Sequence, residues 1–242
     1  MKYFLKNKFE IINADNQSNL IRVKKDFIKL SKKNGFGGYP KDFMKVSVKD
    51  LNLFMKKMNS DMNDVTLKVL NSFYKSINKL CGKYIAFQRN PYLRINCPHI
   101  DSTATIPHND FDFGHSPFGF NIWIPLYDVE GKNGIYMLSE IDSLKIYKNF
   151  KYNQRLDEFL ENKSFSKKKI KFKKNFFKLK FFDGLVFSNK NIHGAISDKN
   201  NKPRISLNMH FQSSNAPFGE KGAEFFNFGF FDKKNKIYKS LT

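Results

Sequence analysis

Beyond residue 84 the hydrophobic residues fall in short runs, some continuous and some alternating with polar residues, and turn-forming residues separate the runs. Runs of this length and period are typical of β-strands and are too short for helices. The pattern predicts eight strands, at residues 84–88, 92–96, 102–106, 118–126, 134–138, 176–182, 184–188 and 203–211. Eight short strands with non-helical links predict a mainly β fold, either a barrel or a jelly roll (double-stranded β-helix).

The beginning of the chain has a different pattern. Residues 1–13 alternate loosely and predict a short strand or hairpin. Apolar residues then recur at helical spacing from Ser18 onward, and Gly35 ends this segment. The first predicted helix therefore lies between Ser18 and Gly35.

Capping residues predict two further helices. Ser47 with Asp50 resembles a capping box in front of the apolar stretch LNLFMKKM. Asp61 or Asn63 is placed to cap a longer helix that runs to Gly82. We expect residues 1–83 to form a mainly helical part packed on the barrel.

Two other segments depart from the strand pattern. The charged stretch at about 139–175 predicts a helical or irregular insertion in the β-rich core of residues 84–212. The aromatic-rich tail, residues 213–242, is expected to pack over the barrel. A chain of 242 residues suits one sizeable domain, so we expect residues 1–242 to form a single unit.

The chain is strongly basic, with a formal net charge of +21, but its basic residues are dispersed. Only five of the 43 are arginine, and the lysines occur in almost every segment. We interpret them as a solvated surface and expect no specific nucleic-acid partner, although such a field would attract an anionic small molecule. Only a guanidinium offers a planar two-pronged donor, so each arginine is a candidate for a specific role.

Cysteine usage and hydropathy bear on location. The two cysteines, Cys81 and Cys97, form no CxxC pair and no disulfide framework, which favours a reducing compartment. Lysine and asparagine interrupt residues 1–13, where a signal peptide needs a continuous apolar stretch. No run approaches the ~18 apolar residues of a membrane span. We expect a cytoplasmic protein.

Two histidines and an aspartate form a candidate metal site. His108 and Asp110 are two positions apart, so at a strand or its end both side chains point to the same side. His193 follows the β-rich middle of the chain, just past the predicted strand 184–188. Two imidazoles and one carboxylate on one face of an octahedron, with the other face open, are the ligands of non-haem iron(II) oxygenases. These three residues are therefore the candidate ligands.

A candidate anion site follows eleven positions beyond His193. Arg204 opens the last predicted strand, and Ser206, two residues on, lies on the same face. An arginine can bind a carboxylate through two parallel hydrogen bonds, and a hydroxyl can add a third. This pair would hold the far carboxylate of 2-oxoglutarate while the 2-oxo acid end chelates iron.

The order H-x-D, a long gap, H and then R-x-S resembles the 2-oxoglutarate/Fe(II) dioxygenases. The stretches FQRNPYLRINCP, PHND, FNIWIPLYD, NIHG and KPRISLN are similar to the phytanoyl-CoA dioxygenase-like branch, and to members encoded in carbohydrate and aminoglycoside biosynthetic clusters. The likeness covers residues 84–212. One departure concerns Asn133-Gly134, which leads into IYMLSEIDS without the PGSH-like turn of many members.

The resemblance implies an enzyme that uses Fe(II), 2-oxoglutarate and dioxygen. Its 2-oxoglutarate would be decarboxylated oxidatively to succinate and CO2, and an unactivated C–H bond of a small molecule would be oxidised, usually by hydroxylation. The expected substrate is a sugar or sugar-bearing metabolite, including an anionic or nucleotide-activated one. The oligomeric state is not predicted by any of these patterns.

The first ligand pair has a rival in His99-Ile100-Asp101. The resemblance places the pair shortly before the strand reading NIWIPL, which favours His108 and Asp110. His210 alternates with core positions on the last strand and is interpreted as structural.

Several further residues are candidates for the pocket. Arg94 and Arg89 precede the ligand pair, where the family often has an arginine in the pocket; structural ion pairs are the alternative. Asn121, a candidate for binding cosubstrate or substrate, shares a strand face with Trp123, a candidate for the substrate pocket, and plain packing of both remains open. His115 lies in a glycine-flanked loop, where a solvated side chain is the simpler interpretation and substrate contact the alternative.

Other classes of protein would share part of this pattern. A cupin-like metal isomerase or epimerase could use the same barrel but would have no need of Arg204 and Ser206. A nucleic-acid or protein demethylating oxygenase would share the metal site. If the partner were a nucleic acid, the binding affinity would fall steeply with salt concentration. A non-catalytic sugar-binding jelly roll would bind neither iron nor 2-oxoglutarate tightly.

Overall fold

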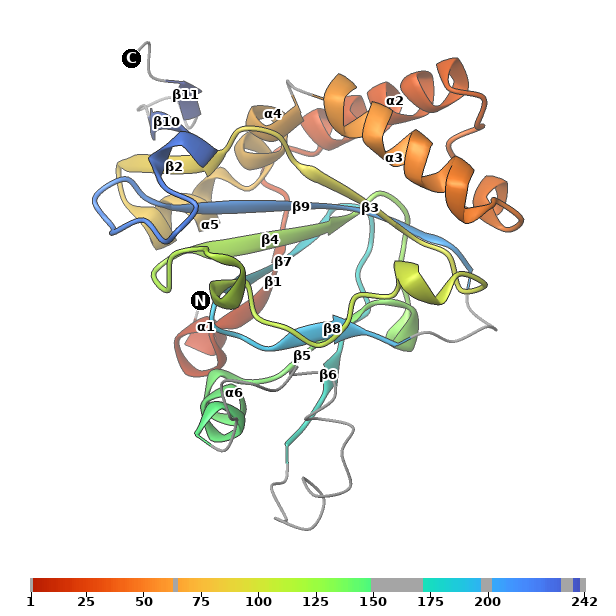
Figure 1. Cartoon of the computed structure of the whole chain (residues 1–242). Helices are drawn as coiled ribbons and strands as arrows, with labels where there is room; N and C mark the ends of the chain where they lie inside the picture. The colour runs from red at the N-terminus through yellow and green to blue at the C-terminus, as the bar shows by residue number, and fades with distance from the viewer. Residues whose placement is uncertain (1, 63–64, 149–171, 197–201, 232–236, 240–242) are drawn as a thin grey trace.

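Two antiparallel sheets form the centre of the computed structural model, which describes residues 2–62, 65–148, 172–196, 202–231 and 237–239 (Figure 1). In these residues the larger sheet has eight strands. Its order is β1 (Phe9–Asn13), β7 (Asp183–Ser188), β4 (Phe120–Pro125), β9 (Arg204–Ser213), β2 (Tyr84–Gln88), β10 (Phe226–Phe231) and β11 (Ile237–Lys239), with β3 (Tyr92–Asn96) also paired to β9. The smaller sheet has the order β6 (Asn175–Phe176), β5 (Ile135–Met137) and β8 (His193–Ala195).

Helices α2, α3 and α4 lie on one side of the large sheet, and the small sheet lies on the opposite side (Figure 1). The helices are α1 (Lys2–Asn7), α2 (Gln17–Lys33), α3 (Val48–Asp61), α4 (Val65–Ser72), α5 (Tyr74–Cys81) and α6 (Glu140–Tyr147). Short 3-10 turns are η1 (Pro40–Phe43), η2 (Asp101–Thr103), η3 (Phe111–Phe113), η4 (Gly131–Asn133) and η5 (Ala223–Phe225). No helix in these ranges is long and apolar enough to cross a membrane.

Strand β9 separates the main core from the interior between the sheets. Its side chains alternate between the two faces of the sheet. One face carries Ile205, Leu207, Met209 and Phe211, which belong to the large apolar core beneath the helices. The other carries a polar row: Arg204, Ser206, Asn208 and His210. The polar row therefore faces the interior between the two sheets.

Strand β4 repeats this division beside β9. Ile122 and Ile124 join the core beneath the helices, whereas Asn121 and Trp123 face the other way. In the register of the two strands, Asn121 pairs with His210 and Trp123 pairs with Asn208. A second apolar cluster lies between the sheets and consists of Phe9, Trp123, Val129, Ile135, Met137, Leu179, Leu185 and Phe187. Two of its members, Trp123 and Ile135, line the same cavity as Arg204, Asn208 and His210 of β9.

The predicted helix signals are mostly confirmed. Helix α3 begins directly after Ser47, whose hydroxyl accepts a hydrogen bond from the backbone N–H of Asp50 at 3.1 Å. Helix α2 begins one residue before Ser18, because Asn16 supplies the capping oxygen. Gly35 follows its end with a φ of +87°, a left-handed conformation that favours glycine.

The long helix predicted up to Gly82 is divided into α4 and α5 at Phe73. The carbonyl of Ser72 accepts hydrogen bonds from the backbone N–H groups of Asp15 and Asn16, at 2.7 and 3.2 Å. This tertiary contact competes with continuation of the helix, and a local pattern cannot reveal it. Of the two candidate caps, Asp61 is the last residue of α3, and Asn63 lies outside the described residues.

Two strand predictions are wrong. Residues 102–106 contain no strand; Thr103 ends the turn η2, and its hydroxyl donates to the carbonyl of Ile100 and accepts from the N–H of Cys97. These side-chain bonds replace strand pairing. In the 176–182 segment only Phe176 belongs to a strand, and Leu179 forms an isolated bridge with Val129.

Both chain ends contribute strands to the large sheet. Residues 9–13 form the predicted strand, β1, whereas the residues before it form helix α1 instead of a hairpin. The aromatic tail supplies β10, which pairs with β2 along the residues Phe226–Phe230. Of the predicted insertion, α6 is described and residues 149–171 lie outside the described residues. The mainly β architecture is confirmed.

Candidate metal centre and ligand pocket

Two histidines and one aspartate converge between the two sheets. The Nε2 atoms of His108 and His193 lie 3.8 and 3.9 Å from the same oxygen, Oδ1 of Asp110. All three candidate donor atoms lie within 4.8 Å of one another. This spacing suits one metal ion between them, and His108, Asp110 and His193 are the one such group of histidine, cysteine, aspartate or glutamate in the described parts of the chain.

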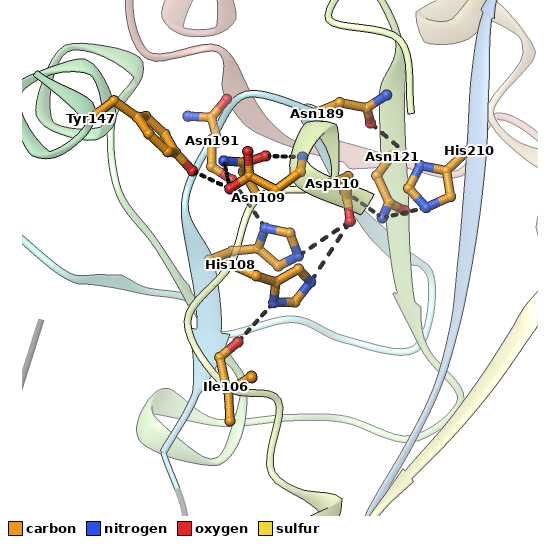
Figure 2. Close-up of polar contacts among 11 residues, drawn as sticks. Ile106, His108, Asn109, Asp110, Asn121, Tyr147, Asn189, Asn191 and His210 are labelled. Atoms are coloured by element: carbon orange, nitrogen blue, oxygen red, sulfur yellow. Dashed lines mark hydrogen bonds and ion pairs between the residues drawn. The ribbon is translucent and has the colours of Figure 1, made fainter. Parts of the chain in front are cut away.

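Backbone carbonyls orient both imidazole rings. Nδ1 of His108 lies 2.7 Å from the carbonyl oxygen of Ile106, and Nδ1 of His193 lies 3.1 Å from that of Asn191 (Figure 2). A carbonyl can only accept, so in each ring Nδ1 carries the proton and Nε2 keeps a lone pair directed toward the centre. Fixing the tautomer in this way is the usual role of the partners behind metal-binding histidines.

Pairing between distant segments brings the ligands together. His108 and His193 form a two-residue bridge in which each backbone N–H donates to the other's carbonyl, at 2.9 and 2.8 Å. Asp110 follows in the turn that opens η3. Gly194 allows this close approach, since a Cβ there would lie 2.8 Å from the Tyr136 hydroxyl and 3.1 Å from the carbonyl oxygen of Thr105.

A buried amide orients the Asp110 carboxylate. Nδ2 of Asn121, on β4, donates to Oδ2 of Asp110 at 3.2 Å, which leaves Oδ1 facing the two imidazoles (Figure 2). Burial works to raise the pKa of Asp110, but the surrounding imidazoles, His210 first, and the Asn121 amide outweigh it and lower this pKa to about 2. The carboxylate is therefore ionised at neutral pH, as a metal ligand must be.

The imidazole of His108 is held neutral. Burial is the main cause that lowers its pKa to about 4, and the repulsion that two protonated rings at His108 and His193 would exert on each other acts in the same direction. A neutral ring near pH 7 keeps the Nε2 lone pair available to a metal.

Hydrogen bonds also secure the loop that carries the first two ligands. Asn109 donates to Oδ2 of Asp112 at 2.9 Å, and its Oδ1 accepts from the Asp112 backbone N–H at 2.7 Å. The Tyr147 hydroxyl, from α6, donates to the same Oδ2 at 3.2 Å (Figure 2). The loop is thereby tied to α6.

A cavity of about 510 Å³ adjoins the candidate metal centre. It contains the three candidate ligands and the inner faces of β3, β4 and β9, and it reaches α3. Polar and charged residues along its wall include Asn52, Tyr92, Arg94, His115, Arg204, Asn208, His210 and Lys221. A cavity of this size can hold a small organic molecule.

Arg204 lies in this cavity as a buried cation. Its Nη1 donates to the carbonyls of Asn133 and Gly134, at 2.6 and 2.8 Å, and its Cζ lies 5.6 Å from the ring centre of Trp123. Burial lowers the pKa of Arg204 to about 10, so the guanidinium remains charged at neutral pH. No carboxylate pairs with it among the residues that the structure describes. A buried charge without an acidic partner is costly, which makes this position a candidate site for an anion.

Unpaired polar atoms continue along the same face of β9. Arg204 Nε, Ser206 Oγ and Asn208 Oδ1 are all buried without a hydrogen-bond partner in the described part of the chain. Buried polar atoms are normally paired, and three in a row on one strand face indicate a ligand that supplies the missing bonds. These residues fit a carboxylate or a similarly polar group.

The predicted pocket residues fall into two groups. Arg94, Trp123 and His115 line the cavity. The solvated interpretation of His115 is wrong: this side chain is buried and stacks on His210, with ring centres 3.5 Å apart. Arg89 lies outside the cavity, because it follows the end of β2 and donates to the carbonyl of Phe226 at 3.3 Å.

The rival pair does not reach the centre. His99 is exposed, its Nε2 lies 3.0 Å from the carbonyl oxygen of Val46, and Asp101 begins the exposed turn η2. Neither residue lines the cavity.

The sequence analysis did not propose every polar cavity residue for the site; His210, Asn208 and Lys221 are among those that it missed. His210 lies beside Asn121 and Asn189, with burial lowering its pKa to about 4, and it belongs to the polar face of β9 (Figure 2). The spacing Arg204-x-Ser206-x-Asn208-x-His210 could have indicated that His210 faces the cavity, because a strand places all four side chains on one face. Lys221 had no such signal among so many lysines.

The Asn121 amide provides a test of the metal centre that leaves all three candidate ligands in place. Replacing Asn121 by alanine should weaken metal binding about 10- to 100-fold, since partners that orient a ligand typically contribute this much. Equilibrium binding of Fe(II) without oxygen measures the effect. Asn52→Ala, in the α3 wall of the same cavity, is the control. Equal affinities for the Asn121 variant and the wild type would contradict the assignment.

Comparison with known proteins finds matches among solved structures only. No family model matches the chain, and no curated protein does. SnoK, described as a non-heme alpha ketoglutarate dependent carbocyclase from nogalamycin biosynthesis, superposes with a TM-score of 0.56 at 12% identity over 90% of this chain and 84% of its own. The non-heme monooxygenase ThoJ gives 0.57 at 10% identity, covering 90% and 78%. AviO1 from Streptomyces viridochromogenes Tue57 gives 0.51 at 12%, covering 90% and 95%. The chain shares their fold.

Proposed function

We propose that this protein is an Fe(II)- and 2-oxoglutarate-dependent oxygenase built on a double-stranded β-helix. The proposal rests on the buried guanidinium of Arg204, which has no carboxylate partner among the described residues and lies in the same cavity as His108, Asp110 and His193. A facial group of two histidines and one carboxylate suits Fe(II), and an anion site at a distance suits the second carboxylate of 2-oxoglutarate.

The chain's residues would divide the work as follows. His108, Asp110 and His193 would hold the metal on one face, and Asn121 would orient Asp110. Bound iron, with 2-oxoglutarate and dioxygen, would supply the oxidation of a C–H bond, yielding succinate, CO2 and an oxidised product.

Arg204 and Ser206 would bind the distal carboxylate. The two backbone carbonyls that hold Nη1 fix the guanidinium, so its remaining donors are already oriented before the anion arrives. The Ser206 hydroxyl, which is buried on the same strand face without a hydrogen-bond partner in the described residues, would donate one further hydrogen bond. Trp123 packs alongside and excludes water from this end of the cavity.

The proposed family placement is the phytanoyl-CoA dioxygenase-like branch. The proposed substrate is a sugar or sugar-bearing metabolite. Hydroxylation is the expected outcome, although SnoK is described as a carbocyclase, so the fold accommodates other oxidative outcomes. A cupin-like isomerase and a sugar-binding module remain the alternatives. Neither needs a buried arginine without a carboxylate, which is why the oxygenase is preferred.

Trp123 gives a direct test, because it is the single tryptophan of the chain and lies in the cavity wall. Without oxygen, 2-oxoglutarate should change the fluorescence of the Fe(II)-loaded protein, saturating at one equivalent per chain. In air the same sample should release succinate, and leaving out either iron or 2-oxoglutarate should prevent this. Protein that binds metal but never 2-oxoglutarate would refute the proposal and favour the isomerase or the binding module.

A further inference from the structure

Two more cations line the cavity besides Arg204. Arg94 lies on β3, where it is paired directly opposite Ser206 of β9, so its side chain leaves the sheet on the cavity side. Lys221 approaches from the loop that precedes β10. The two therefore come from segments more than 100 residues apart in the chain and face the same space.

Close backbone contacts hold Lys221 at the cavity. Its backbone N–H donates to the carbonyl of Gly114 at 3.0 Å, and the Ser116 hydroxyl donates to the carbonyl of Pro217 at 2.6 Å. A Cβ at Gly219 would lie 2.7 Å from the carbonyl carbon of His115, so the two loops touch without side chains between them. The position of Lys221 is thus built into the fold and differs from that of a lysine dispersed over the surface.

Neither cation has an acidic partner in the described residues. Asp110 is the one carboxylate among the cavity-lining residues, and it belongs to the candidate metal centre. Lys221 Nζ lies 4.8 Å from the ring centre of Phe225, a contact that stabilises a cation without neutralising it. Two unneutralised cations remain beside the centre.

The loaded site would carry more positive than negative charge. If the proposed function holds, Fe(II) contributes two positive charges, 2-oxoglutarate two negative, Asp110 one negative and Arg204 one positive, which sum to zero. Arg94, which is exposed, and Lys221, which is half-buried, then leave two positive charges at the open side of the cavity. An anionic group that enters the cavity would be attracted to both.

We propose, on the basis of this proposed function, that the substrate carries an acidic group, a phosphate or a carboxylate, bound between Arg94 and Lys221. Asn52 and Tyr92 line the same region and offer an amide and a hydroxyl to a polar molecular body. The acidic group would anchor the substrate at the cavity entrance and direct its other end toward the metal centre. Arg94 and Lys221 are thus specificity-determining residues.

A titration that compares a neutral sugar with anionic ligands tests this. The protein is loaded with Ni(II), which should replace Fe(II) without turnover, and with saturating 2-oxoglutarate so that Arg204 is occupied. Glucose, glucuronate, glucose 1-phosphate and inorganic phosphate are then titrated by calorimetry, with Trp123 fluorescence as a second readout. We expect binding of the three anions and none of glucose, with affinity falling as salt concentration rises.

Single substitutions identify the residues responsible. Arg94→Gln and Lys221→Gln should each weaken binding of the anions about tenfold, since each removes one charged contact. Arg22→Gln and Lys25→Gln are matched controls on the exposed surface of α2 and should change nothing. Equal affinity in wild type and both cavity variants, or failure of all three anions to bind, would overturn the proposal.

Titrating 2-oxoglutarate into the same Ni(II)-loaded variants separates this proposal from the proposed function. If Arg94→Gln weakens 2-oxoglutarate as strongly as Arg204→Lys does, Arg94 belongs to the cosubstrate site, and the substrate proposal fails while the oxygenase stands. If 2-oxoglutarate does not bind the wild type, the oxygenase fails. In that case, phosphate binding that depends on Arg94 and Lys221 would still establish an anion site.

Discussion

Replacing His193 by alanine is expected to abolish tight Fe(II) binding, with a loss on the order of 100-fold or more. The ring is one of the three candidate donors in the described residues, and the neighbouring imidazole of His108 cannot replace it because it is itself a candidate ligand. His108→Ala should have the same effect. Asp110→Ala should abolish turnover and at least weaken the metal. Equilibrium titration without oxygen measures the affinities.

His99→Ala is the matched control for these variants. It removes a histidine from the rival His-x-Asp pair, whose ring lies against the carbonyl of Val46, away from the cavity. Its Fe(II) affinity should equal that of the wild type. If instead His99→Ala destroyed binding and His108→Ala spared it, the candidate metal centre would be wrong.

Arg204→Lys is expected to weaken 2-oxoglutarate binding roughly 10- to 150-fold, corresponding to about 1.5–3 kcal/mol for one charged hydrogen bond in a pocket. Lysine keeps the charge but loses the second parallel donor and the planar fork. Fe(II) affinity should hardly change, since Arg204 is not among the candidate ligands. Succinate release measured against 2-oxoglutarate concentration, together with Fe(II) titration, gives both quantities.

Two companion variants make the Arg204 result specific. Ser206→Ala should act in the same direction but more weakly, because it removes a neutral donor. Arg22→Lys makes the same substitution on the exposed surface of α2, away from the cavity, and should leave 2-oxoglutarate binding unchanged. Arg204 also holds the carbonyls of Asn133 and Gly134, so thermal unfolding of each variant must be recorded. An unchanged 2-oxoglutarate dependence in a folded Arg204→Lys protein would refute the cosubstrate site.

Local patterns in the sequence determined much of the architecture. Alternation along β9 and β4 follows from the two-residue period of a strand, which needs no knowledge of the rest of the chain. The capping of α3 by Ser47 is equally local, because donor and acceptor lie within four residues. The candidate ligand pair His108 and Asp110, and the candidate anion pair Arg204 and Ser206, were proposed from the sequence for the same reason.

The contacts that complete the site are between distant segments. His108 differs from His99 because its backbone forms a bridge with that of His193, which lies 85 positions later in the chain. Only the pairing of these remote segments creates this bridge. The buried position of His115 depends on packing against β9. Lys221 reaches the cavity because its loop lies against Gly114, and nothing in its neighbours along the chain marks it among the lysines.

The errors have two origins, one local and one tertiary. The predicted strand at 102–106 contains a turn, because the Thr103 hydroxyl bonds the backbone N–H of Cys97 and the carbonyl of Ile100. In a strand these backbone groups would pair with a neighbouring strand. The long helix ends early because the carbonyl of Ser72 accepts hydrogen bonds from the backbone N–H groups of Asp15 and Asn16. Residue type and period determined which faces are polar, which residues cap helices and which residues can bind a metal. Tertiary structure alone decided which of them meet, because the free energy of a contact between remote segments depends on the whole chain that closes the loop.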